Sequence, residues 1–227
     1  MSARQLLDQL LQSGQGLARD ASTRVQSATA GGNAPSFLAG LGGGALGAGA
    51  LGLLMGSKKA RKIGGKVAMY GGMAALGALA YRAYGDWQRN QAAQASAPAP
   101  QTLDRLPPAQ AEQHSSAILT AMIGAAKADG HIGNEERHLL ETELGKLSAD
   151  ATDRRWLEAE LARPLDPAAI ATAAQTPEMA AEMYLASLLM VDEESYMERA
   201  YLDELARQLK LAPDLKAQLE AQVKAPA

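Results

Sequence analysis

Two pairs of acidic residues recur at one spacing in the C-terminal half of the chain. Asp129 is followed six residues later by Glu135, and Asp192 is followed six residues later by Glu198. In each pair, one acid stands at a helix exit and the other in the first turn of the next helix. If the two turns lie side by side, four carboxylates converge, and hard divalent cations prefer such oxygen ligands. The pattern therefore predicts a candidate divalent-cation site at these four residues.

The same acids have a second interpretation that needs no ion. Asp caps turns by accepting backbone hydrogen bonds, and a Glu in a first helical turn is stabilised by the helix dipole. The spacing is also not that of an EF-hand, because the third position counted from Asp129 is His131 and the twelfth is Leu140. Helix capping and cation binding therefore both fit the sequence.

No arrangement typical of an enzyme accompanies these acids. The sequence contains no HExxH, GxSxG, P-loop or GxGxxG motif in a suitable context. A metal-dependent hydrolase would need a general base beside the acids, and the sequence shows none. We therefore expect a protein that is not an enzyme, with no cofactor beyond the candidate divalent cation.

The elements that must position the acids are predicted to form an all-α domain over residues 112–227. Apolar residues recur there at helical spacing, and no strand pattern is present. Asp166 and Thr176 are each followed by proline, which is typical of a helix start, and Pro213 opens a last helix. These signals predict seven short helices around a single core.

Two segments in this domain carry a resemblance to a known family. AMIGAAKADGHIGNEERHLLETEL and VDEESYMERAYLDELARQLKL resemble the two repeats of the TerB-like domain of tellurite-resistance proteins. With its glycine-rich N-terminal half, the whole chain resembles the YebE family of bacterial inner-membrane proteins. The resemblance implies a pseudo-repeated helical domain over residues 112–222 and metal association by the four acids named above. Glu193 stands where the first repeat has Gly130, so the second turn departs from the first.

The N-terminal half contains a long uncharged stretch, Ser36–Gly56, which is rich in Gly, Ala and Leu. As a helix it is long enough to cross a bilayer. The alternative is a glycine-rich linker in a soluble protein, although such linkers are more often rich in Gly and Ser. From Gly40 to Gly72, every fourth residue is Gly or Ala. That rhythm would give a smooth helix face that packs closely against another helix.

A second apolar stretch, Val67–Tyr81, follows the basic cluster between Lys58 and Lys66. The two stretches predict either one membrane span or a helical hairpin, and the basic cluster favours the cytoplasmic side. These alternatives place the C-terminal domain on different sides of the membrane. We expect a protein of the bacterial inner membrane, with the lipid bilayer as one partner.

The remaining segments complete a four-part organisation. Residues 1–35 are predicted to form an amphipathic helix and a loop, and the helix either packs against a protein neighbour or lies on a membrane surface. Residues 36–87 form the predicted membrane region. Residues 88–111 contain four prolines among Gln, Ala and Ser, which favours an extended tether. The helical domain over residues 112–227 follows.

Charge is divided unevenly between the two halves. Residues 1–111 carry 11 Lys and Arg against 4 Asp and Glu, whereas residues 112–227 carry 11 against 21. The acidic half would repel nucleic acid, so no nucleic-acid partner is expected. The absence of cysteine excludes disulfides and thiolate metal sites.

Taken together, these features predict a membrane-anchored helical interaction module with a role in envelope or metal stress. It would act through a protein partner, or through self-association by its Gly and Ala helix faces. The alternative function is a domain that binds or senses a divalent cation through its paired acidic turns.

Overall fold

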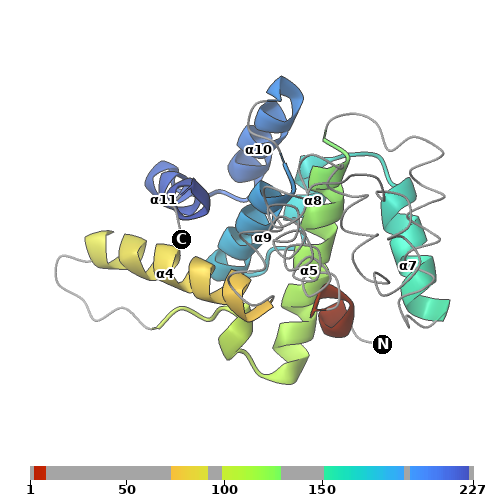
Figure 1. The fold of residues 1–227 in the computed structure, drawn as a ribbon, viewed down its shortest axis with the longest axis horizontal. Coiled ribbons are helices and arrows are strands. Elements are labelled where there is room, and N and C mark those ends of the chain that lie inside the picture. Colours follow the sequence, from red (N-terminus) through yellow and green to blue (C-terminus); the bar gives the residue numbers. More distant parts are fainter. Residues whose placement is uncertain (1–2, 9–72, 92–98, 129–150, 192–194, 225–227) are drawn as a thin grey trace, which may run out of the picture.

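A computed structural model of the 227-residue chain describes residues 3–8, 73–91, 99–128, 151–191 and 195–224. Within these ranges all regular structure is helical, which confirms the all-α prediction (Figure 1). The predicted pseudo-repeat of seven helices includes residues 129–150 and so lies partly outside the described residues. Residues 3–8 are helical, and the other elements are α4 (Met73–Gln91), η2 (Leu103–Arg105), α5 (Pro108–Ala126), α7 (Ala151–Ala162), α8 (Pro167–Ala171), α9 (Pro177–Met190), α10 (Tyr196–Gln208) and α11 (Pro213–Lys224).

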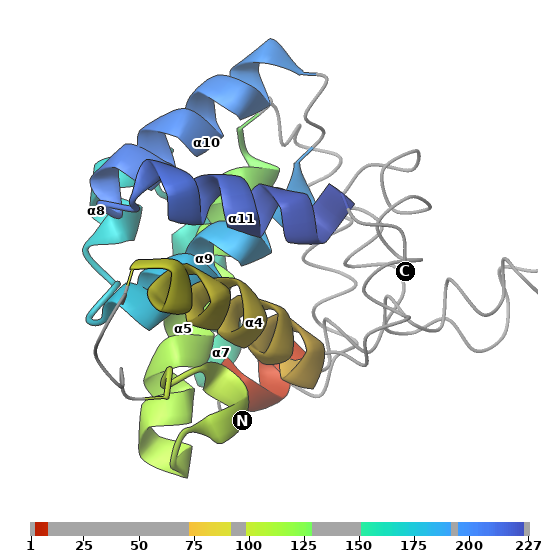
Figure 2. The same cartoon turned by 90° about the vertical axis from the view of Figure 1, so that its left-hand side faces the viewer.

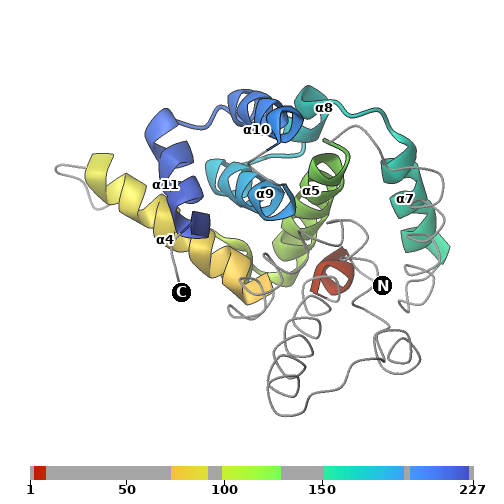
Figure 3. The same ribbon diagram turned by 45° about the horizontal axis from the view of Figure 1, so that its top comes forward.

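Helix α9 is the centre of this arrangement. Every residue from Met179 to Met190 is buried. A helix that is apolar on all sides is stable only where its neighbours cover it completely. Helix α9 packs against α4, α5, α10 and α11, and Figure 3 shows these helices around it.

Helices α5 and α9 run in the same direction. His114 of α5 lies against Glu182 of α9, and farther along both helices the Ser187 hydroxyl donates a hydrogen bond to the Ala121 carbonyl at 3.3 Å. Because residue numbers rise together in these two contacts, the helices are parallel. Their C-terminal ends therefore lie at the same end of the core.

Local capping explains where two of the helices begin. The Asp166 carboxylate accepts hydrogen bonds from the amides of Ala168 and Ala169 at 2.9 and 3.2 Å. The Thr176 hydroxyl accepts one from the amide of Met179 at 3.1 Å. Each capping residue is followed by proline at the start of the helix, where proline is well tolerated. These bonds confirm the predicted starts of α8 and α9, and α11 also begins at the predicted proline.

Two glycines allow elements to approach closely. A Cβ atom on Gly77 would lie 2.6 Å from Asp104 Oδ1 and 2.9 Å from the Asp104 amide nitrogen, so η2 packs directly on α4. A Cβ atom on Gly124 would lie 2.4 Å from Ile170 Cδ1 and 2.7 Å from the Tyr201 hydroxyl oxygen. Helices α8 and α10 therefore rest on α5 at a position that has no room for a side chain.

Helix α4 corrects the membrane prediction. It contains most of the second apolar stretch, and Leu76, Leu79, Ala80 and Tyr84 are buried in the protein core, where α4 packs against α9 and α11. Among the described helices, none combines the length and the apolar character needed to cross a bilayer. This finding contradicts the expected transmembrane helix and the expected inner-membrane location. The predicted span Ser36–Gly56 lies outside the described residues.

The N-terminal helix and the predicted tether also pack on this core. Leu6 and Leu7 are 2% and 0% exposed, so residues 3–8 follow the packed alternative rather than the membrane-surface one. Figures 1 and 2 both place this segment beside α5. The predicted tether over residues 88–111 includes the end of α4, which continues to Gln91, and the start of α5 at Pro108. Leu103, which lies between these helices in the sequence, is buried.

Candidate functional site

A groove of about 600 Å³ opens where four parts of the chain meet. These parts are the C-terminal half of α4, helix α8, the start of α9 with the residues before it, and the end of α10 with the loop into α11. The lining includes Tyr84, Trp87, Ala171, Thr176, Lys210 and Leu215. Its residues come from distant parts of the sequence, and the central packing of α9 brings them together.

One wall of the groove is aromatic. The ring centroids of Tyr84 and Trp87 are 5.3 Å apart, and the ring planes are inclined by 51°. Burial raises the pKa of the Tyr84 hydroxyl, and the nearby charge of Glu178 raises it further, so the phenol is neutral at physiological pH. Rigid aromatic rings offer a large apolar contact surface with few rotatable bonds. This wall is therefore suited to hold an apolar group.

Lys210 follows α10 in an unusual backbone conformation. Its φ is 55°, in the left-handed region. The amide of Leu211 donates to the Ala206 carbonyl at 3.0 Å, and the amide of Lys210 donates to the Arg207 carbonyl at 3.1 Å. This pair of bonds is a Schellman motif, in which glycine normally occupies the left-handed position. A residue with a side chain costs about 1 kcal/mol in this conformation. Lys210 therefore makes the fold less stable than glycine would at the same position.

The charge of the groove comes from the same residue. Among the described lining residues, Lys210 alone carries a charge, and its side chain is exposed. Gln175 and Gln208 also line the groove; their side-chain amides can donate and accept hydrogen bonds, and the Gln208 nitrogen donates to Glu204 Oε1 at 2.6 Å. An apolar wall, amide groups and one cation together suit a ligand that carries an apolar group beside an anion.

The predicted cation site falls mostly outside the described residues, so it stays a prediction. Asp129, Glu135 and Asp192 lie outside the described residues. Glu198 is described, and it lies buried in the first turn of α10, where its amide donates to the Ser195 hydroxyl at 3.5 Å. In the part of the chain that the structure describes, no three His, Asp or Glu side chains form a cluster that could hold a metal ion.

A polar pair that the sequence analysis did not single out lies inside the core, between α5, α9 and η2. His114 Nδ1 and Glu182 Oε2 are 2.7 Å apart, and the Leu103 amide donates to Glu182 Oε1 at 2.5 Å. Glu182 and His114 are 0% and 4% exposed. Burial raises the pKa of the Glu182 carboxyl, and the hydrogen bonds from His114 and Leu103 oppose that rise. Because the pair is closed to solvent, it joins helices and offers no surface to a ligand.

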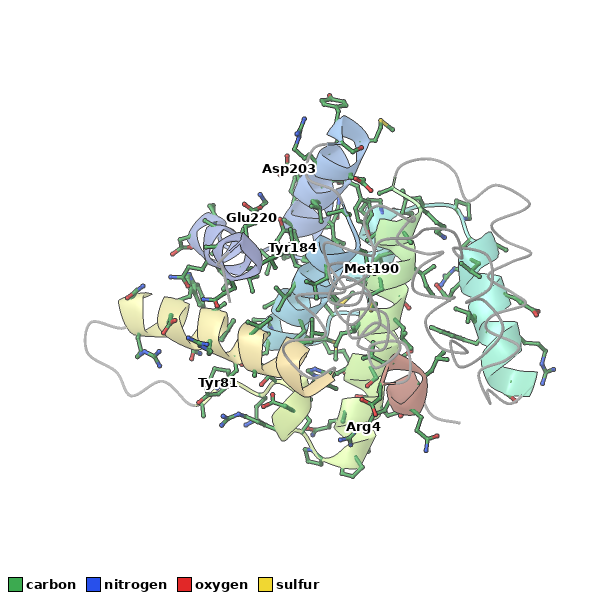
Figure 4. All side chains as sticks on the ribbon, in the orientation of Figure 1. Arg4, Tyr81, Tyr184, Met190, Asp203 and Glu220 are labelled. Carbon is green, nitrogen blue, oxygen red and sulfur yellow. The ribbon has the colours of Figure 1, made fainter. Side chains whose placement is uncertain are left out.

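A partly buried contact ties α9 to the elements beside the groove. The Tyr184 hydroxyl donates to Glu220 Oε1 of α11 at 2.9 Å. Lys216 Nζ of α11 lies 2.7 Å from Glu220 Oε1 and 3.2 Å from Asp203 Oδ1 of α10. Figure 4 shows Tyr184, Glu220 and Asp203 at this junction. The network fixes α10 and α11 relative to α9, and so positions the loop that carries Lys210.

The described chain is an all-helical core with an open, mostly apolar groove that carries one cation. A family model matches residues 40–223, and the chain belongs to this family, which is described as a protein of unknown function, DUF533. The family is TerB-like in general, which confirms that part of the predicted resemblance, whereas the match does not establish the YebE membrane family.

A curated relative from Yersinia enterocolitica covers part of the chain. It is an uncharacterized protein in the ampR 5′ region, and it is 30% identical over 113 residues, which are 50% of this chain and 81% of the relative. No solved structure matches the chain. Neither the family description nor the name of the relative states a function.

Proposed function

We propose that the chain is a non-catalytic helical interaction module whose groove binds a segment of a protein partner. The bound segment would present an apolar side chain next to a carboxylate. The observation that carries this proposal is Lys210, a charged residue in a left-handed conformation at an apolar groove. Backbone strain of this kind tends to be retained where a side chain serves a function.

The size and lining of the groove support a peptide segment as the ligand. Its volume of about 600 Å³ falls within the range of about 300–1,000 Å³ that is typical of ligand sites. The partly exposed Trp87, held beside the buried Tyr84, supplies apolar contact. The side-chain amide of Gln175 can match the paired donor and acceptor of a peptide group, whereas the Gln208 amide nitrogen already donates to Glu204 Oε1 at 2.6 Å. The Lys210 ammonium then selects a neighbouring carboxylate.

NMR of the full chain provides a direct test, because the protein has two tryptophans. Trp87 lines the groove, whereas Trp156 lies on α7, which contributes no lining residue. Titration with acetyl-Ala-Leu-Glu-Ala-amide should shift the indole N–H signal of Trp87 and leave that of Trp156 in place. The matched peptide with Gln instead of Glu should bind about two- to fivefold more weakly, as expected for one exposed ion pair.

A pair of variants separates recognition by Lys210 from general attraction between charges. Lys210→Gln should abolish the preference for the Glu peptide. Arg82→Gln removes an exposed cation of α4 that does not line the groove, and it should leave that preference unchanged. Equal shifts of both indole signals, or no preference between the peptides, would contradict the proposal.

A further inference from the structure

The first turn of α10 exposes two large apolar side chains next to each other in the sequence. Tyr196 is 75% exposed and Met197 is 57% exposed, and neither residue lines the groove. The other methionines whose burial the structure describes are at most 4% exposed, and these are Met122, Met179, Met183 and Met190. Within this described set, a reagent in solution therefore reaches Met197 first.

The thioether of an exposed methionine reacts with two-electron oxidants such as peroxides. The sulfur lone pair attacks one peroxide oxygen, an S–O bond forms and the O–O bond breaks. The sulfur is oxidised to a sulfoxide, and hydrogen peroxide is reduced to water, which carries away both protons. A sulfoxide is polar, so it disrupts a core but is tolerated on a surface. The same reaction therefore has different consequences at Met197 and at a buried methionine such as Met183.

Helix α10 is held in place without the Met197 side chain. The Ser195 hydroxyl caps the helix by accepting a hydrogen bond from the Glu198 amide at 3.5 Å. The residues of α10 that are buried in the protein are Glu198, Tyr201, Leu202, Leu205 and Ala206. Because Met197 is not among them, a sulfoxide at this position leaves the packing of α10 unchanged.

We propose that Met197 is a reversible oxidation site, which peroxides convert to the sulfoxide and a thiol-dependent methionine sulfoxide reductase restores. In the return step, two thiols are oxidised to a disulfide and the sulfoxide oxygen leaves as water. The chain contains no cysteine, so the thiols belong to the reductase. The exposure that admits the peroxide also admits the reductase, and the fold stays intact throughout. Each cycle turns the exposed apolar pair of Tyr196 and Met197 partly polar and back.

Limited oxidation of the full chain with hydrogen peroxide, followed by site-resolved mass spectrometry, tests this proposal. In the folded chain, Met197 should gain oxygen about tenfold faster than each of the four buried methionines, because oxidation follows exposure. In concentrated urea, the five rates should be similar. After brief oxidation, the two stereospecific methionine sulfoxide reductases with dithiothreitol should return Met197 to the thioether. The circular dichroism of the oxidised chain should match that of the untreated chain.

Met197→Leu is the matched control. It should remove the fast oxidation at this position and leave the rates of the four buried methionines unchanged. Equal rates at Met197 and Met183 in the folded chain would overturn the proposal. A Met197 sulfoxide that the reductases repair only after proteolysis of the chain would also overturn it. So would a loss of circular dichroism on oxidation that the wild type shows and Met197→Leu does not.

Discussion

The groove beside Lys210 and the α5 surface under residues 3–8 show two different ways of handling apolar surface. On α5, the chain covers the surface with Leu6 and Leu7, and the Glu112 carboxylate accepts hydrogen bonds from the amides of residues 3 and 4. At the groove, Trp87 stays partly exposed beside the buried Tyr84, and a lysine occupies a position that favours glycine. The α5 surface is buried like the rest of the core, whereas the groove retains a backbone conformation that lowers stability. That difference is the reason to assign ligand binding to the groove.

The largest expected effect concerns the buried pair of His114 and Glu182 in the core. Glu182→Ala removes the partner of His114 and of the Leu103 amide, and should lower the free energy of unfolding by about 3 kcal/mol, because buried polar groups are left unpaired. Urea denaturation followed by circular dichroism measures this loss. Glu182→Gln, which retains a hydrogen-bonding side chain, should lose less than half as much. Equal losses for the two substitutions would show that hydrogen bonding at this position is unimportant.

The second effect concerns the covered surface itself. Leu7→Ala should lower stability by about 2 kcal/mol, the lower end of the range for buried leucines, since only a short segment is released. Hydrogen exchange should speed up at residues 3–8 more than in α9. If exchange rises equally in both, the segment is an inseparable part of the core and does not dock as a unit.

The third effect has the opposite sign and belongs to the groove. Lys210→Gly relieves the left-handed conformation and should raise stability by about 1 kcal/mol. The urea midpoint should rise, and binding of the Glu-containing peptide should weaken in the same variant. A lower midpoint would mean that contacts of the Lys210 side chain outweigh its backbone strain, and the comparison between the two regions would fail.

The smallest effect is a difference in pH dependence. The folded-state pKa of Glu182 is raised, so the folded chain binds this proton more tightly than the unfolded chain does. The resulting stability is present below the ordinary pKa of the carboxyl and is lost as pH rises through the raised value. The free energy of unfolding of Glu182→Gln, compared with wild type at each pH, should therefore improve as pH rises above about 4.5. A constant difference between the two proteins would contradict this cause.

Local physics made part of the fold predictable from sequence. The starts of α8 and α9 follow from Asp166 and Thr176, because a capping oxygen and a proline act within one helical turn. The apolar character of α4 was also visible. The sequence did not show whether α4 packs in a protein core or in a bilayer, because leaving water is favourable for Leu76 and Leu79 in both cases.

The candidate site was less predictable, for reasons that differ between residues. Lys210 gives no sequence signal of its left-handed backbone, since lysine is common near helix ends for other reasons. The groove depends on the arrangement of four distant parts of the chain. Glu182 did leave a signal: it is the only charged residue between Met179 and Met190 in the sequence. A lone acid in an apolar helix is a reason to look for a buried partner.

The contact at Gly124 has a mechanical consequence for the groove. Helix α8 provides part of the groove lining, and it is braced against α5 through Ile170 at a point where even one methyl group would collide. The seat of α8 on α5 therefore depends on the absence of a side chain at position 124. A methyl group added there would have to displace the end of the Ile170 side chain or shift α8, and it would do so from a position that does not itself line the groove.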